Sequence, residues 1–443
     1  MEYSALLLIL VLVSLVVEAQ IPLQCANIET LTSRTCCPVP DLPDAGPCGA
    51  NLGRGSCRPV AVPDSKFDAE QKDVRVNWPI QYFNSTCVCG ERFGGVDCGE
   101  CSYAYNDGGN CERKTVLPRK SVAELTDEDW REYVAVLLRA QAFPSRYMVV
   151  TVNFTTDYQT LVDSMTRPSV YHMFVWVHYT ASNTPGINSM HDMAHQGPGF
   201  PTWHRLLILW FERELQVMLG DHLFRFHYWN WLDPTQRDVP FTPHRLGATV
   251  DTIVTGDLVD GNWSLICWFD KRNFTRPDNP VWPSYADYQF ALSIKNYDVS
   301  PYNALVKCTE ESYRSYMEGF LNERGADCGD DPMCSPIHNI LGLGNLTARP
   351  TFLQTGVMGD GSASPNDPIF INHHTMVDCM LEEWIQKYQV GEEAYPTSRR
   401  IKYGHRATDY IVPFIPVYQQ KEMLVSADNF GAFGTDCSVS ATA

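Results

Sequence analysis

The stretch HDMAHQGPGFPTWHRLLILWFERELQVMLGDHLFRFHYWNW, from His191 to Trp231, decides the fold. His195 and His204 lie nine residues apart within it. The segment between them contains three residues that disfavour a helix, Pro198, Gly199 and Pro201. Thr202 is a good helix cap, and the run after it has no Gly or Pro until Gly220. The sequence therefore predicts a helix from Thr202, apolar on every side in its first half and hence buried.

A third histidine, His178, lies in the aromatic run VYHMFVWVHYT, which also predicts a buried helix. A single histidine of this kind is more often a core residue bonded to a neighbouring carbonyl. Several histidines on apolar helices, with almost no lysine or arginine among them, favour a metal site instead. Imidazole suits copper, zinc, iron and nickel.

A second histidine cluster follows about 140 residues later. It begins with His338 and ends in SPNDPIFINHHTMVDCMLEEW, which contains His373 and His374. Asp367, followed by proline, predicts a helix start, and the helix should reach about Tyr388.

These two clusters resemble the paired copper motifs of the tyrosinase family, whose members hold a type 3 dinuclear copper centre. HQGPGFPTWHR and HYWNW match the family's first motif, and His338-Asn339 with NDPIF match its second. The resemblance covers nearly the whole chain after the leader and implies two copper ions. It implies His178, His195 and His204 as ligands of the first copper, and His338 and His374 as ligands of the second.

One departure from the family pattern affects the second copper. The family's second histidine in His-Asn-x-x-His falls here on Gly342, so this site is incomplete. His373 is a possible substitute for the missing ligand. Adjacent helical residues point about 100° apart, so His373 and His374 should reach one metal only if the backbone bends.

The resemblance implies a copper-dependent oxidoreductase that uses O2. It would hydroxylate monophenols at the ortho position and oxidise o-diphenols to o-quinones, as in melanin-type pigment synthesis. By the same resemblance, Glu318 and Asn339 orient a water or take the phenol proton, although Glu318 is as readily a solvated helix acid. Asp378, one turn after His374, is a candidate to hold a ligand's second N–H.

Two alternatives remain because of Gly342. In the first, the chain is a tyrosinase-related protein that binds zinc or a single copper and has a non-oxidase role in the melanin pathway. Zinc binds imidazole but does not undergo redox chemistry. In the second, the chain is an inactive secreted glycoprotein that acts as a binding module.

The predicted fold is mainly α, with a four-helix-bundle copper core and loop-rich decorations. Residues 1–19 predict a signal peptide, with a membrane anchor as the less favoured alternative. Residues 20–113 form a cysteine-rich, EGF-like region, residues 114–420 the copper domain, and residues 421–443 a tail without a transmembrane helix. Thr126 predicts the start of the copper domain's first helix.

Ten of the sixteen cysteines lie in the cysteine-rich region. Behind a signal peptide they predict disulfides rather than zinc ligands, with a connectivity that spacing does not give. The other six form three bridges, or Cys379 stays reduced in its helix.

The leader and the sequons place the protein in the secretory pathway, secreted or in the lumen of a melanosome-like organelle. N-glycans are expected at five positions, Asn84, Asn153, Asn262, Asn273 and Asn345. The formal net charge of −18 argues against nucleic acid or an anionic membrane as a partner. The expected partners are a phenolic small molecule and O2, with no stable membrane anchor.

Overall fold

The computed structural model describes residues 16–61, 83–103, 105, 111–112, 119–153, 157–183, 192–242, 244–247, 250–253, 271–273, 282–299, 312–318, 334, 337–338, 357–359, 361–398 and 400–426. Asn339 and Gly342, on which two of the predictions depend, lie outside these residues.

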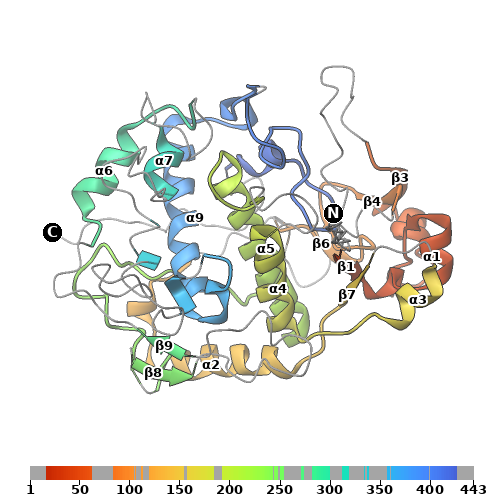
Figure 1. Cartoon of the computed structure of the whole chain (residues 1–443), viewed down its shortest axis with the longest axis horizontal. Helices are drawn as coiled ribbons and strands as arrows, with labels where there is room; N and C mark the ends of the chain where they lie inside the picture. The colour runs from red at the N-terminus through yellow and green to blue at the C-terminus, as the bar shows by residue number, and fades with distance from the viewer. Residues whose placement is uncertain are drawn as a thin grey trace, which may run out of the picture.

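Helices dominate the described residues, as the sequence predicts (Figure 1). The α-helices are α1 (Ile28–Ser33), α2 (Asp127–Ala142), α3 (Tyr158–Asp163), α4 (Val170–Ser182), α5 (Gly199–Leu219), α6 (Tyr285–Ser293), α7 (Tyr313–Glu318) and α9 (Ile369–Tyr388). Short 3-10 helices are η1 (Leu23–Cys25), η2 (Pro47–Leu52), η5 (Val122–Glu124), η6 (Val357–Gly359), η7 (Ser364–Asn366), η8 (Glu392–Ala394) and η9 (Gln420–Met423).

The strands are short and form four small sheets among the described residues. The strands are β1 (Val16–Pro22), β2 (Thr35–Cys36), β3 (Gly55–Pro59), β4 (Ser85–Cys89), β5 (Phe93–Gly94), β6 (Glu100–Cys101), β7 (Tyr147–Asn153), β8 (Val250–Ile253) and β9 (Lys271–Asn273). β1 pairs antiparallel with β7, and the three-stranded sheet has the order β2-β4-β3. The other two sheets, β5-β6 and β8-β9, are two-stranded.

The predicted helix boundaries hold for α2 and for the end of α9, but the predicted start of α5 is wrong. Thr126 caps α2 by accepting the Asp129 N–H at 3.2 Å. α5 begins at Gly199 instead of Thr202, because a proline in the first turn removes an N–H that has no helical partner. The Thr202 hydroxyl donates to Gln420 Oε1 at 2.6 Å, so it joins α5 to the C-terminal segment.

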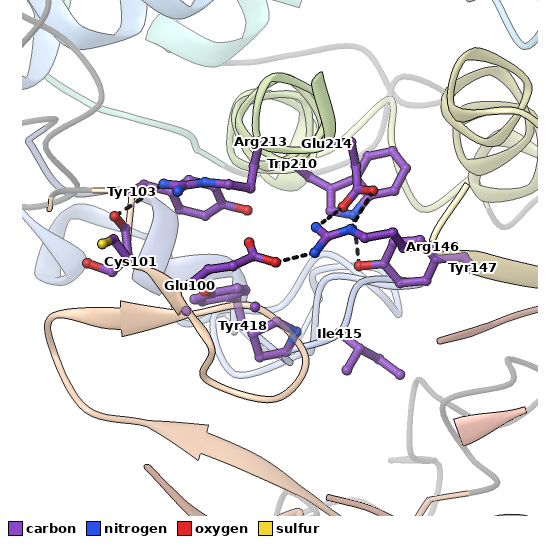
Figure 2. Close-up of a pocket in the computed structure, with 14 residues that line it drawn as sticks. Glu100, Cys101, Tyr103, Arg146, Tyr147, Trp210, Arg213, Glu214, Ile415 and Tyr418 are labelled. Carbon is purple, nitrogen blue, oxygen red and sulfur yellow. Dashed lines mark hydrogen bonds and ion pairs between the residues drawn. The ribbon is translucent and has the colours of Figure 1, made fainter. Parts of the chain in front are cut away.

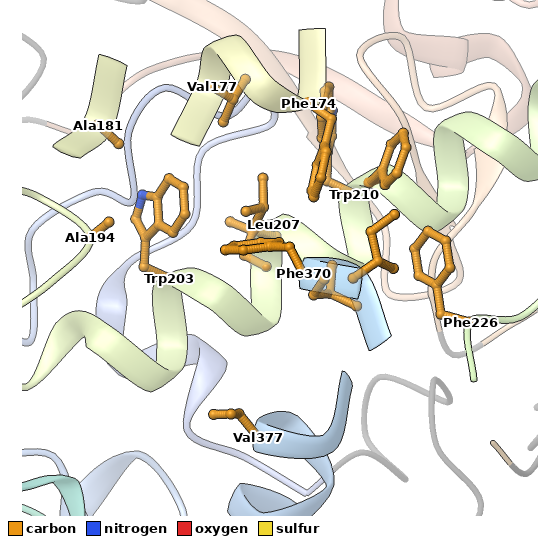
Figure 3. Close-up of a cluster of buried hydrophobic side chains, with 14 of the residues drawn as sticks. Phe174, Val177, Ala181, Ala194, Trp203, Leu207, Trp210, Phe226, Phe370 and Val377 are labelled. Carbon is orange, nitrogen blue, oxygen red and sulfur yellow. The ribbon is translucent and has the colours of Figure 1, made fainter. Parts of the chain in front are cut away.

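Helices α4, α5 and α9 lie together at the centre of the molecule (Figure 1). Figure 3 shows Phe174 of α4, Leu207 of α5 and Phe370 of α9 filling the space among them. All three side chains are fully buried. The rings of Phe174 and Phe370 pack edge to face, with centroids 5.9 Å apart. His338 is helical as well, but residues 335–336 and 339–356 lie outside the described residues, so the four-helix core remains a prediction.

The cysteine-rich region is held by disulfides, which excludes the zinc alternative there. The five bridges are Cys25–Cys36, Cys37–Cys57, Cys48–Cys87, Cys89–Cys98 and Cys101–Cys111. Of the two other described cysteines, Cys379 agrees with the expectation of bridges, whereas Cys334 departs from it. Cys379 of α9 is disulfide-bonded, and Cys334 is a free, buried thiol.

The cysteine-rich region docks on α5 through Arg146 at the start of β7 (Figure 2). The Arg146 guanidinium contacts Glu100 of β6 and donates to Glu214 of α5 at 2.6 Å. Arg213 of α5 donates to the Ser102 carbonyl at 3.2 Å. A protein region with this small a core gains stability from such docking as well as from its disulfides.

β1 contains the end of the predicted signal peptide. Cleavage after Ala19 leaves Gln20, Ile21 and Pro22 paired with β7. Gln20 and Ile21 are fully buried, so this remaining part of the strand is anchored. Among the described residues, no helix is both long and apolar enough to cross a membrane.

A buried ion-pair network joins α5 to α9. The Arg205 Nε donates to Asp378 Oδ1 at 2.6 Å, and its Nη2 donates to Glu382 Oε2 at 3.1 Å. Nη1 donates to the carbonyl of Val425 at 2.8 Å. Because Arg205 follows His204 directly and Asp378 lies one turn after His374, this network sets the relative position of the histidine-bearing helices.

We predict that Arg205→Met lowers the free energy of unfolding by about 3–5 kcal/mol, because it leaves Asp378 and Glu382 as buried carboxylates without their cation. The matched control is Arg131→Met on α2, which removes an exposed pair with Glu128 at 3.9 Å and should cost under about 0.5 kcal/mol. Denaturant unfolding followed by tryptophan fluorescence measures both. Equal losses in the two variants would contradict the role of Arg205.

Candidate metal centre

Three of the predicted histidines form one buried group. His178 lies on α4, His204 on α5, and His195 in the non-helical loop before α5. One ring nitrogen from each lies within 4.8 Å of the others, and no side chain of the three is more than 5% exposed. The sequence therefore identified all three members of this group, but His195 comes from a loop and not from a helix.

Each of these imidazoles has its Nδ1 hydrogen-bonded away from the centre of the group. His178 Nδ1–H donates to the Ser362 carbonyl at 3.1 Å, and His204 Nδ1–H donates to the Phe200 carbonyl at 2.9 Å. His195 Nδ1–H donates to the Asp192 carboxylate at 2.9 Å. The bonds to carbonyls fix the tautomer of His178 and His204, so the Nε2 of each of these two rings carries a lone pair and no proton.

The free lone pairs meet in a way that suits a metal ion. His178 Nε2 and His204 Nε2 lie 3.3 Å apart, although neither carries a proton to share. Two nitrogens bound at about 2.0–2.1 Å to one tetrahedral metal lie about 3.3–3.4 Å apart. The observed distance is thus the distance expected for two ligands of one ion.

Burial keeps His178 and His204 neutral, which is the form of imidazole that binds metals. Desolvation lowers the pKa of both His178 and His204 well below the usual value, and the other histidines of the group lower it further. A neutral imidazole at neutral pH is a ligand that needs no deprotonation.

The loop that carries His195 is held at several points that the sequence interpretation missed. The Lys402 ammonium donates to the His195 carbonyl at 2.5 Å. Burial alone would raise the pKa of Asp192, but His195 and Lys402 outweigh it and hold that pKa well below its usual value. The buried His405 accepts the Gly199 N–H at 3.1 Å. A Cβ at Gly199 would lie 2.8 Å from His405 Nδ1, so only glycine fits there.

The remaining predicted histidines form a second group together with a cysteine, in which Cys334, His373 and His374 are buried and His338 is partly exposed. Its members, whose ligand atoms lie within 4.8 Å of one another, are Cys334, His338, His373 and His374. His338 Nδ1–H donates to the Met358 carbonyl at 2.9 Å, which leaves its Nε2 free. Burial lowers the pKa of His338 to about 4.

His373 and His374 both belong to this group although α9 runs without interruption from Ile369 to Tyr388. The two side chains thus come within 4.8 Å of each other without an interruption of the helix, and binding of both to one metal stays a prediction. The two ring centroids lie 4.9 Å apart, because the side chains converge on the same space from neighbouring positions of the helix.

His374 has a feature that points to a bound cation. Its side chain is 1% exposed, and within the described part of the chain neither of its ring nitrogens has a hydrogen-bond partner. A buried polar group without a partner costs about 1–3 kcal/mol unless a bound ion or water satisfies it. The residues present therefore fit a metal at this second group as well.

The two groups adjoin each other. The rings of His204 and His374 stack with centroids 4.4 Å apart, and their planes differ by 10°. Phe370 lies against both groups, with its ring centroid 5.0 Å from that of His178 and 4.1 Å from that of His374. This arrangement places two candidate metal positions side by side in an apolar environment.

Glu318 is buried at 1% exposure, so the alternative of a solvated helix acid is wrong. Its Oε2 accepts from Arg314 at 3.0 Å, and its Oε1 accepts the Gln196 N–H, next to His195. Burial raises the pKa of Glu318, while Arg314 and the Gln196 N–H limit the rise. The other predicted catalytic residue, Asn339, lies outside the described residues.

Within the described part of the chain Asp378 accepts no N–H from a histidine, so that expectation is also wrong. Its Oδ1 is taken by Arg205. Backbone carbonyls orient His178, His204 and His338 instead.

The main residue that sequence reasoning missed is Cys334, which was counted among the bridge-forming cysteines. A usable signal was present, because Cys334 precedes His338 by four residues, the spacing that places two side chains on one helix face. Asp192 carried a similar signal, three residues before His195.

Comparison with known proteins finds a family match over the segment that contains both histidine groups. The profile of the common central domain of tyrosinase matches residues 168–387, which contain every histidine of both groups. Tyrosinase of Bos taurus is 29% identical over 443 residues, covering 93% of this chain and 80% of the bovine protein. The 5,6-dihydroxyindole-2-carboxylic acid oxidase of Ambystoma mexicanum is 30% identical over 455 residues, covering 93% and 82%.

Among solved structures, a mutant polyphenol oxidase from Thermothelomyces thermophila aligns with 72% of this chain and 87% of its own, at 16% identity and a TM-score of 0.44. The sequence relatives extend across the cysteine-rich region as well as the central domain, since they cover 93% of the chain. On the match to the tyrosinase profile and the similarity to these sequence relatives, the chain belongs to the tyrosinase family.

Proposed function

We propose that this protein is a copper-dependent oxidase of phenols that binds two metal ions in the adjoining histidine groups. The observation that carries the proposal is the pair of unprotonated nitrogens, His178 Nε2 and His204 Nε2, that face each other at 3.3 Å in a buried site. Two lone pairs at this distance repel each other unless a cation lies between them. His178, His195 and His204 would hold the first copper.

His338 and His374, with His373 beside them, would hold the second copper. Copper, when bound, supplies the redox chemistry with O2 that no side chain of the site offers. The protein contributes positions fixed by buried helices and an apolar wall, including Phe370, that keeps water out. The reaction we propose is ortho-hydroxylation of monophenols and oxidation of o-diphenols to o-quinones, as in melanin-type pigment synthesis.

We infer a proton-handling role for Glu318 in this reaction. Its carboxylate is buried close enough to the histidine groups for His195 to lower its pKa. A phenol must lose its proton to be oxidised, and a buried carboxylate whose pKa is raised accepts that proton more readily than an exposed one. Asn339 would orient a water or the substrate beside it.

The protein acts in the secretory pathway on this proposal, either secreted or in the lumen of a melanosome-like organelle. The five disulfides support an oxidising compartment. The side chain of Asn84 is exposed and accessible to glycosylation. N-glycans at the other four sequons stay predictions, since their side chains lie outside those that the structure describes.

A second candidate function is favoured by the Cys334 thiol in the second group. Thiolate and imidazole together are common zinc ligands, so this group could hold zinc, which does not react with O2 by redox. The chain would then be a tyrosinase-related protein with a non-oxidase role in pigment synthesis. Metal identity separates this candidate from the oxidase.

We predict that secreted, copper-loaded protein contains about two copper ions per chain and oxidises L-dopa in an oxygen-dependent reaction. His178→Ala should lower the copper content to about one and abolish oxidation, because it removes a ligand of the first metal. The matched control is His172→Ala, on the same helix but outside both groups, which should keep both properties.

Elemental analysis and oxygen consumption measure these outcomes. Zinc, or a single copper without oxidation, would favour the redox-silent candidate. A wild-type chain that takes up no metal would refute both and leave the binding-module interpretation.

We further predict that Glu318→Gln lowers kcat for L-tyrosine and L-dopa by about 100-fold, while the copper content stays at two and KM changes little. The amide keeps an acceptor for the Gln196 N–H but does not take a proton. Glu214→Gln is the control, a buried glutamate also paired with arginine but about 15 Å along α5 from His204. If the Glu318→Gln variant loses copper, Glu318 has a purely structural role, in which it holds the loop that carries His195.

A further inference from the structure

The second histidine group contains a thiol to which the proposed oxidase activity assigns no role. Cys334 is free and 2% exposed, and its Sγ lies 3.3 Å from His373 Nε2. Its ligand atom is within 4.8 Å of those of His338, His373 and His374. Neither ring nitrogen of the buried His374 has a hydrogen-bond partner among the described residues, which independently indicates that a cation belongs in this space.

The position of Cys334 relative to His338 explains how a thiol comes to be there. Family resemblance expects an imidazole four residues after His338, where this chain has Gly342. Cys334 lies four residues before His338, and both residues are helical. The side chains of Cys334 and His338 reach the same group.

We propose that Cys334 is a ligand of the second metal and takes the place of the imidazole that Gly342 lacks. This inference rests on the proposed function, because it requires a metal at the second group. Metal binding would convert the thiol to a thiolate and release its proton to solvent. The second metal then has a sulfur ligand and imidazoles, while the first metal has three imidazoles.

The chemistry of this donor set makes the two metal positions unequal. Three neutral imidazoles leave the charge of the first ion uncompensated, whereas a thiolate removes one unit of charge from the second. Soft thiolate ligands favour monovalent copper and zinc. The second position should therefore hold zinc or monovalent copper more tightly than a site of two imidazoles would.

X-ray absorption at the zinc edge tests the proposal on the secreted full-length chain loaded with zinc alone. Zinc is used because it does not oxidise the thiol. Wild-type protein should bind about two zinc ions per chain and show a sulfur neighbour at about 2.3 Å in addition to nitrogens at about 2.0 Å. This measurement does not depend on any variant folding.

Two variants distinguish the positions. Cys334→Ser should lose the sulfur neighbour and weaken the second zinc more than about 100-fold, since removal of outer-shell partners alone costs 10–100-fold. His204→Ala should weaken the first zinc and keep the sulfur neighbour.

Two zinc ions with only nitrogen or oxygen neighbours would overturn the role of Cys334 while leaving the two-metal centre intact. A wild-type chain that binds neither zinc nor copper would overturn the proposed function together with this inference. A sulfur neighbour that persists in Cys334→Ser would also contradict the assignment.

Discussion

The structure depends on one buried arginine. Arg205 has a fully buried side chain whose guanidinium contacts Asp378 and Glu382 of α9 and a carbonyl of the C-terminal segment. Three charges inside a protein are tolerated only when they are paired and hydrogen-bonded, so this network permits few relative positions of α5 and α9. Since His204 and His374 lie beside these charged residues, the same network brings the two histidine groups together. Metal geometry is thus set by helix docking as much as by the histidines themselves.

The histidines are buried in a form that is ready to bind metal. Backbone carbonyls accept the Nδ1–H of His178, His204 and His338. Because a carbonyl does not titrate, these three hydrogen-bond acceptors stay the same at every pH. Desolvation disfavours the imidazolium, and the remaining nitrogen points into the site. A site built in this way needs little reorganisation when a metal enters, because the tautomer and the ring orientation are already fixed.

The two groups differ in how firmly they are held. Every imidazole of the first group has an Nδ1 partner. In the second group His338 has one, whereas neither His373 nor His374 has an Nδ1 partner within the described residues. The second group is therefore less preorganised, and it is also the group from which Gly342 removes the family's ligand. A thiol at Cys334 is consistent with a site whose ligand set has changed.

The sequence by itself determined those features that depend on residues close to one another along the chain. Four features follow from local conformation or residue type and could be predicted. They are the first histidine group, the cap at Thr126, the end of α9 and the disulfides of the cysteine-rich region. Tertiary structure decided the burial of Glu318, the pairing of Asp378 with Arg205, and the presence of Cys334 among the imidazoles. These features depend on contacts such as the one between residues 205 and 378, which are 173 positions apart. Local sequence patterns specify the elements, but only the packing of those elements specifies which side chains share a site.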